Sequence, residues 1–230
     1  MAATTGATRY GRLAGLGYVV IFALAIHANF AVIEALPSES GPAAVADFIR
    51  ENAMLWRLAI AEFLVVMAVD IVVAYALYRL LEGRARGLNA LSALFRLGYT
   101  VANIPVILML LTALRWASAE SVPNELSDAM AAQTALGYGP AFTLTLGFFG
   151  VHLVLLATAI IVSGRLPKVI GFLTGVAGLA YTLDALGYLL LPDLRTANIS
   201  IVAPLVIVPA LIGEGLLMLW LLFGPLKGRA

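Results

Sequence analysis

The chain has no cysteine among its 230 residues, and it has only two histidines. The missing cysteines exclude disulfides, thiolate metal sites and cysteine nucleophiles. Charged residues are also scarce, at 12% of the chain, whereas hydrophobic residues make up 62%. Soluble domains are about half apolar and about a quarter charged. The composition therefore excludes an ordinary soluble domain and indicates a membrane protein.

Several nucleotide and metal motifs are missing as well. The sequence has no Walker loop, no dinucleotide-binding glycine fingerprint, no HExxH and no aspartate-rich DDxxD motif. Gly171, Gly175 and Gly178 have the spacing of a helix-packing groove. The two histidines lie in different predicted helices and could ligate a haem axially, but no further histidine exists for a second site. We therefore expect no cofactor, no metal site and no nucleic-acid partner.

The chain does contain six long apolar runs. A helix needs about 20 apolar residues to cross the roughly 30 Å hydrocarbon core of a bilayer, and unpaired strands could not persist there. We therefore predict an all-α fold, a polytopic transmembrane helical bundle of six spans that forms a single transmembrane domain over residues 1–230. The predicted spans cover about 11–36, 54–79, 88–115, 137–163, 168–191 and 201–224.

Two of the connections carry helix signals. Ser40 is expected to cap a short helix through Phe48, because serine is a good N-cap. Pro123 and Asn124 are a helix-start signal inside the polar segment that precedes the fourth span. We expect residues 37–53 and 116–136 to form the long external segments.

Lysine and arginine are unequally distributed over the two ends of the predicted spans. The cytoplasmic loops of membrane proteins carry the excess of these residues. Only Arg50, Arg115 and Arg195 lie at one end, whereas nine lie at the other: Arg9, Arg12, Arg79, Arg84, Arg86, Arg165, Lys168, Lys227 and Arg229. The distribution predicts a multi-pass protein of the cell membrane with both termini in the cytoplasm. The first apolar run is longer than the core of a signal peptide, so it is predicted to be a span.

Ionisable residues also lie inside the predicted spans, where each is expensive and needs a partner or a purpose. They are His27, Glu34, Arg57, Glu62, Asp70, Arg96, His152, Asp184 and Glu214. Asp70 and Arg96 match in depth and are expected to form a buried ion pair, and His152 could share a hydrogen bond with Glu214. Even with both arginines paired and Glu34 placed at the interface, two carboxyls are left over. Buried carboxyls of this kind are candidates for a functional site.

Helical spacing gathers the polar residues into stripes. Ser92, Arg96, Thr100 and Asn103 share one helix face, and Tyr181, Asp184 and Tyr188 share another. Polar faces that meet in a bundle enclose either a hydrogen-bonded core or a cavity. The predicted site has the catalytic residues Glu62, Asp184, Glu214 and His152, and the ligand-binding residues His27, Asn103, Tyr181, Tyr188, Arg96 and Asp70.

A resemblance to a known family rests on four short segments. They are Phe95-Arg96-Leu97, Phe148-Phe149-Gly150-Val151-His152, Ser163-Gly164-Arg165-Leu166-Pro167-Lys168-Val169-Ile170-Gly171, and Gly213-Glu214 followed by Leu219-Trp220-Leu221. With these landmarks the chain resembles a small bacterial six-helix membrane family that is catalogued as a domain of unknown function. The resemblance covers nearly the whole chain and implies the six-span topology, and it implies no activity.

Three functions fit these features. The first is a cavity that binds or converts a lipophilic small molecule, in its sharpest version by acid catalysis on an isoprenoid-like substrate. The second is a proton-coupled transporter with Asp184, Glu214 and His152 as relay groups, which predicts a homodimer because six spans are few for one transport unit. The third is a structural or accessory membrane protein whose buried charges only set the helix register. In all three, membrane lipids are the surrounding partners.

Overall fold

The computed structural model describes residues 2–83 and 85–226, with side chains from residue 6 onward. Within these residues the fold is all helical, and six helices are long and apolar enough to cross a membrane, which confirms the six predicted spans. In chain order the elements are α1 (Ala2–Ala28), the π-helical turn η1 (Asn29–Ile33), the 3₁₀ turn η2 (Ser38–Ser40), α2 (Pro42–Glu51), α3 (Ala53–Leu80), α4 (Arg86–Ala117), α5 (Asn124–Ser163), α6 (Lys168–Leu190), α7 (Pro192–Ala197) and α8 (Ile199–Phe223). The six long ones are α1, α3, α4, α5, α6 and α8.

Three of the residues behind the predicted orientation, Arg84, Lys227 and Arg229, lie outside the described residues. The cytoplasmic placement of both termini stays a prediction.

Helix α5 is longer than the sequence predicted. It begins at Asn124, as the Pro123 signal indicates, but continues without a break to Ser163 and so takes in most of the expected external segment. In its first turn the backbone N–H of Ser127 donates to the Pro123 carbonyl at 3.0 Å. Ser127 and Ala131, one turn apart, are fully buried. The polar extension therefore packs one face against the protein, and the length of the apolar run could not reveal this.

The start of α2 also differs from the prediction. Ser40 ends the turn η2, and Gly41 is the N-cap without any side-chain hydrogen bond. Gly41 has a φ of 90°, which glycine adopts without strain, and Pro42 fills the first turn, where its missing N–H needs no acceptor. The predicted Ser40 cap is wrong, although the short helix is present.

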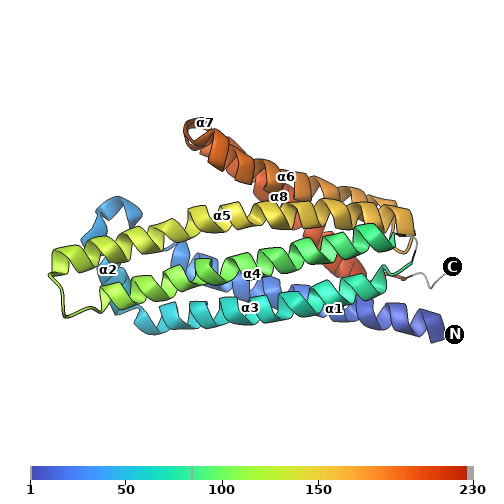
Figure 1. Cartoon of the computed structure of the whole chain (residues 1–230), viewed down its shortest axis with the longest axis horizontal. Coiled ribbons are helices and arrows are strands. Elements are labelled where there is room, and N and C mark those ends of the chain that lie inside the picture. Colours follow the sequence, from blue (N-terminus) through green and yellow to red (C-terminus); the bar gives the residue numbers. More distant parts are fainter. Residues whose placement is uncertain (1, 84, 227–230) are drawn as a thin grey trace. The chain divides into compact units, whose positions relative to one another are not determined.

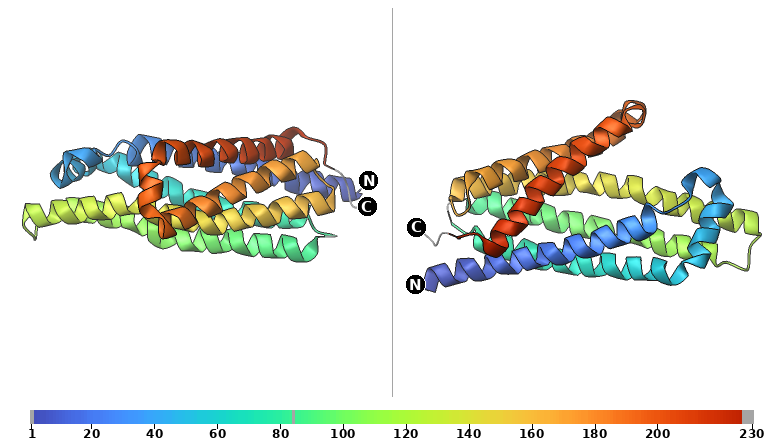
Figure 2. Two further views of the ribbon diagram at one scale, coloured as in Figure 1. Left: turned by 90° about the horizontal axis from the view of Figure 1, so that it is seen from above. Right: turned by 180° about the vertical axis from the view of Figure 1, so that it is seen from behind.

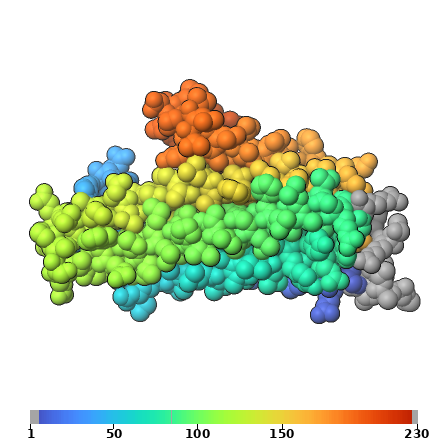
Figure 3. Space-filling view, viewed as in Figure 1, coloured from blue at the N-terminus to red at the C-terminus, as the bar shows by residue number. Residues whose placement is uncertain are grey.

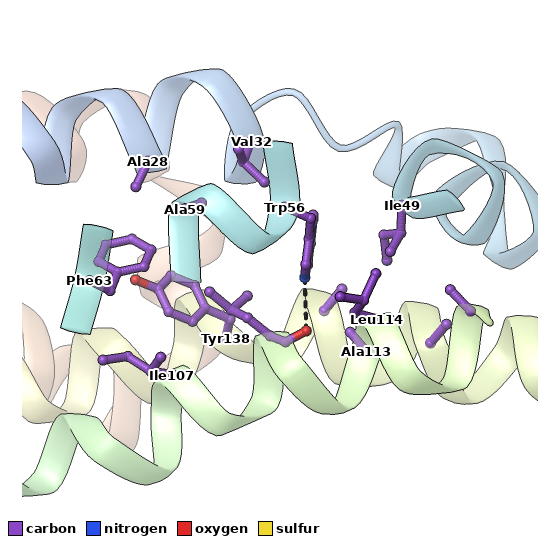
Figure 4. Close-up of a cluster of buried hydrophobic side chains, with 14 of the residues drawn as sticks. Ala28, Val32, Ile49, Trp56, Ala59, Phe63, Ile107, Ala113, Leu114 and Tyr138 are labelled. Carbon is purple, nitrogen blue, oxygen red and sulfur yellow. Dashed lines mark hydrogen bonds between the residues drawn. The ribbon is translucent and has the colours of Figure 1, made fainter. Parts of the chain in front are cut away.

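Val20–Ala68 and Ala102–Phe142 form one compact unit, called the Trp56 unit below. Its apolar core surrounds the fully buried Trp56, whose Nε1 donates to the Leu110 carbonyl at 2.8 Å (Figure 4). This bond satisfies the only polar atom of the indole. The ring of Tyr138 packs against Phe63 in the same core, with 5.6 Å between the ring centroids.

Arg50 ties α2 to its neighbours in the Trp56 unit. Its Nε donates to the Ala117 carbonyl at 2.6 Å, and its two Nη atoms pair with Asp47 and Asp128. The hydrogen bond with Asp128 is the main reason why the pKa of Arg50 is raised above its ordinary value. The arginine therefore stays charged, and the expected external helix α2 is held by ionic contacts as well as by its buried apolar face.

The described parts of Met1–Val19, Val69–Val101 and Thr143–Ala230 form a second compact unit, called the Arg96 unit below. In it α6 and α8 run side by side and are joined by the short helix α7 (Figures 1 and 2). Figure 3 shows the segment around α7, in orange, at the molecular surface. The single transmembrane domain over residues 1–230 stays a prediction.

Glycines let the helices of the Arg96 unit approach closely. A Cβ atom added to Gly178 of α6 would lie 2.6 Å from the Gly150 carbonyl oxygen of α5, and one added to Gly213 of α8 would lie 2.6 Å from the Leu173 carbonyl oxygen. Real Cβ atoms do not come this close to backbone, so small residues are required at both crossings. The predicted packing role is confirmed for Gly178.

Candidate functional site

Arg96 lies at the centre of a buried hydrogen-bond network in the Arg96 unit. Its side chain is fully buried, with Nε and Nη2 donating to Asp70 Oδ1 at 3.0 and 2.5 Å. The other carboxylate oxygen of Asp70 accepts from Thr100 Oγ1 at 2.6 Å. Nη1 of Arg96 donates to the Tyr18 hydroxyl at 2.8 Å. The predicted Asp70–Arg96 pair is confirmed, and the predicted α4 stripe does supply the network with Arg96 and Thr100.

His152 of α5 completes this network. Arg96 Nη1 lies 3.2 Å from His152 Nε2, and His152 Nδ1 lies 2.9 Å from the Ser92 carbonyl oxygen. An arginine can only donate and a carbonyl can only accept, so the bonding assigns the neutral tautomer with its proton on Nδ1. The Ser92 hydroxyl in turn donates to the His152 carbonyl at 3.1 Å. Both ring nitrogens are therefore occupied by the protein.

Glu214 of α8 has a different partner from the one expected. It is 4% exposed, and its Oε1 accepts from the Tyr181 hydroxyl of α6 at 3.1 Å. The suggested hydrogen bond between His152 and Glu214 is wrong, because His152 bonds to Ser92 and Arg96 instead. The predicted depths of these residues in the membrane could not show whether His152 or Tyr181 is the partner of Glu214. The Tyr181–Glu214 bond joins the same two helices that Gly213 brings together.

Aromatic rings cover the polar cluster. The guanidinium carbon of Arg96 lies 4.9 Å from the ring centroid of Tyr18 and 5.2 Å from that of Phe149. Phe149 also stands edge-on to Tyr181, with centroids 5.8 Å apart. These contacts favour a positive charge at Arg96 and exclude water from it. Within the described residues the cluster is a closed, satisfied polar core.

Asp184 of α6 has an unexpected partner. Its two carboxylate oxygens accept from Nε and Nη2 of Arg195 at 2.7 and 3.1 Å, which makes a two-point ion pair. The ring of Tyr188 lies 5.2 Å from the guanidinium carbon of Arg195. The hydrogen bonding of Arg195 to Asp184 is the main cause of the raised pKa of Arg195. The sequence placed Arg195 beyond the span, but α7 carries it back beside the carboxylate.

This ion pair lies in the wall of an apolar groove. The groove has a volume of about 750 Å³ and is open on one side. Its lining residues come from α6, α7, α8 and the connecting residues Leu191 and Asn198, and apart from Asp184, Arg195 and Asn198 they carry no polar side chain. The apolar lining includes Leu183 and Leu205. A volume of this size, with few polar groups, is typical of sites for small lipophilic molecules.

Two predicted site residues meet in the Trp56 unit. His27 Nδ1 of α1 lies 2.9 Å from Glu62 Oε2 of α3, with side-chain exposures of 45% and 12%. The π-helical turn η1 begins two residues after His27. Asn103, also in this unit, is buried in α4 and has a polar contact of its own. The sequence placed His27 and Glu62 on separate helices without predicting that they touch.

The ten predicted site residues thus fall into separate groups. Asp70, Arg96 and His152 form one cluster, Tyr181 and Glu214 form a bond of their own, and Asp184 and Tyr188 surround Arg195. His27, Glu62 and Asn103 belong to the Trp56 unit. Sequence reasoning missed Tyr18 and Arg195. Tyr18 has no spacing signal. For Arg195 the one signal is Pro192, which marks a chain break after α6 but does not say where the following residues lie.

In the part of the chain that the structure describes, no group of three or more His, Asp or Glu side chains is placed so that it could hold a metal ion. Arg96 and the Ser92 carbonyl hold the two ring nitrogens of His152, so neither nitrogen is left for a ligand.

Comparison with known proteins gives one match. The family described as a domain of unknown function, DUF4386, matches residues 13–224, which is nearly the whole chain. No curated protein and no solved structure matches the chain. The matched range takes in α1 from residue 13 onward and the whole of α3, α4, α5, α6 and α8, and with them the buried network and the groove. The chain belongs to this family.

Proposed function

We propose that this is a multi-pass protein of the cell membrane that binds a lipophilic small molecule in the groove between α6, α7 and α8. The observation that carries the proposal is the groove itself, about 750 Å³ of mostly apolar lining with a single ion pair, Asp184–Arg195, in its wall. Leucine and valine side chains supply a favourable surface for a hydrocarbon chain. The few polar groups supply one place for a head group.

The predicted orientation says where that head group would be. The distribution of lysine and arginine puts Arg195 and the rest of α7 at the outer end of the spans. Arginine and tyrosine are typical of the membrane–water interface, and Arg195 and Tyr188 lie beside each other. The ligand would then lie along α6 and α8 with its polar end at the outer surface.

A binding role has more support than acid catalysis or proton-coupled transport, which the sequence also allows. Acid catalysis needs a carboxyl that can deliver a proton to the substrate, and both oxygens of Asp184 already accept hydrogen bonds from Arg195. A proton relay through His152 needs a ring nitrogen that can change its proton, and both are held by Ser92 and Arg96. Neither difficulty applies to a groove that only binds.

The experiment is to fill the groove and measure what binds. Ala180 lines the groove, so Ala180→Trp should occupy the space of the ligand. Phe172→Trp is the matched control, because Phe172 is an exposed residue of the same helix outside the groove. The purified protein in detergent is offered oleyl alcohol, oleate and oleylamine, and bound molecules are counted by native mass spectrometry.

We expect the wild type and Phe172→Trp to bind at least one of the three amphiphiles saturably, and Ala180→Trp to lose that binding while its melting temperature stays close to that of the control. Equal binding by Ala180→Trp and by the control would mean that the groove is not the site.

A further inference from the structure

We propose that the groove selects amphiphiles with an uncharged head group, and that Asp184 is the residue that enforces this choice. The inference rests on the proposed function, because it names the ligand class of the same site. Three polar side chains line the groove: Asp184, Arg195 and Asn198. All three lie at its α7 end, so they are the groups that a ligand head would meet.

The ion pair makes the polar end of the groove electrically neutral. Asp184 and Arg195 are matched by two hydrogen bonds, and their side chains are only 9% and 19% exposed. An anionic head would have to compete with Asp184 for Arg195 and would meet the repulsion of the carboxylate. A cationic head would meet the same difficulty with Arg195. In apolar surroundings neither repulsion is screened well, and the desolvation of the head would not be repaid.

An uncharged head avoids this cost and still finds donors. Of the guanidinium nitrogens, Nε and Nη2 donate to Asp184, and within the described residues Nη1 has no protein acceptor. Asn198 uses one N–H of its amide for the Leu194 carbonyl, at 2.8 Å, which leaves its other N–H and its oxygen. A hydroxyl or a carbonyl group fits such a set, because it accepts from these donors without adding a charge.

Tyr188 keeps the guanidinium in place for this role. Its ring lies 5.2 Å from the guanidinium carbon, and stacking of this kind restricts the motion of an arginine side chain. Arg195 is thereby held between the ring and Asp184. The neutral, donor-bearing end of the groove is therefore a fixed feature rather than one that a ligand has to assemble.

Charge-changing variants test the inference. Asp184→Asn removes the carboxylate and leaves Arg195 without a counter-charge, whereas Arg195→Gln removes the guanidinium and leaves Asp184. The double variant Asp184→Asn/Arg195→Gln is neutral again. Each protein is measured against oleyl alcohol, oleate and oleylamine, which have the same chain length, at about pH 8, where the carboxylate and the amine are both ionised.

We expect the wild type to bind oleyl alcohol about tenfold more tightly than either charged amphiphile, which corresponds to one uncompensated charge in the groove. Asp184→Asn should prefer oleate, Arg195→Gln should prefer oleylamine, and the double variant should again prefer the alcohol. Melting temperatures identify a variant that does not fold. The variants that do fold still show whether the order of affinity for the three amphiphiles changes with the charge of the groove.

The same order of preference in all folded variants, or a wild type that prefers oleate, would overturn the inference while leaving groove binding intact. Binding that Ala180→Trp does not reduce would instead overturn the proposed function itself.

Discussion

Replacing Asp70 by leucine tests whether the buried network holds the Arg96 unit together. Asp70 accepts three hydrogen bonds, two from Arg96 at 3.0 and 2.5 Å and one from Thr100 at 2.6 Å. Side-chain hydrogen bonds between membrane helices are worth about 0.6 kcal/mol each, so the three bonds by themselves account for about 2 kcal/mol. The substitution does more than remove bonds, because it leaves the fully buried guanidinium of Arg96 without a counter-charge.

Breaking a buried ion pair by removing one partner costs about 3–5 kcal/mol. We therefore expect Asp70→Leu to shift the unfolding equilibrium by roughly 10²–10⁴-fold. The measurement is reversible unfolding in mixed micelles of dodecyl maltoside and sodium dodecyl sulfate, followed by circular dichroism. Asp193→Leu is the control, since Asp193 is an exposed acid of α7, and it should change stability by less than about 0.5 kcal/mol.

The double variant Asp70→Leu/Arg96→Met separates the charge from the bonds. It removes the buried charge together with its partner, so it should be less destabilised than Asp70→Leu alone. A cost of Asp70→Leu below about 1 kcal/mol, or single costs that simply add in the double variant, would refute the reasoning.

Three further outcomes can be checked with the same assay or with the binding assay. Gly150→Ala should destabilise the protein by about 1–3 kcal/mol, because the new Cβ would lie 2.6 Å from the Gly178 carbonyl oxygen, whereas Gly139→Ala, with no atom within 4 Å, should have little effect. Trp56→Phe should cost about 1–3 kcal/mol, since it leaves a buried carbonyl without its 2.8 Å donor; unchanged unfolding would contradict that role. The pKa of Arg195 is raised, so the guanidinium is charged at every pH below its ordinary pKa and loses its charge only above the raised pKa. The affinity for oleyl alcohol should therefore stay constant between about pH 6 and about pH 9.

The six helices could be predicted because the length of an apolar run depends only on the local sequence and on the thickness of a bilayer. The pairing of Asp70 with Arg96 could be predicted for a related reason: both lie at the same depth on consecutive spans, and opposite charges in an apolar medium attract. The ends of helices outside the predicted membrane region were harder to predict from the sequence. The extension of α5 to Asn124 depends on Ser127 and Ala131 packing against other helices, and composition does not reveal packing.

The partner of Asp184 could not be predicted because it depends on where the chain turns. Arg195 lies eleven residues after Asp184, which on a continuous helix would be three turns further along the axis. The break at Leu191 and the short helix α7 bring the two together. Tyr18 could not be predicted for another reason: a tyrosine in an apolar run has the same sequence context whether it only packs or also accepts a hydrogen bond, as Tyr18 does from Arg96.

The excess of buried acids, which the sequence offered as its main sign of function, has a different meaning in the structure. Asp70, Asp184, Glu62 and Glu214 each have a polar partner, in Arg96, Arg195, His27 and Tyr181 respectively. A missing partner is therefore not what separates a functional carboxyl from a structural one. The surroundings of each pair do so: the Asp70–Arg96 pair is sealed by aromatic rings, whereas the Asp184–Arg195 pair faces a groove large enough for a ligand. Both ion pairs are equally satisfied. The Asp70–Arg96 pair can only stabilise the fold, whereas the Asp184–Arg195 pair can also select a ligand, because a ligand in the groove can reach it.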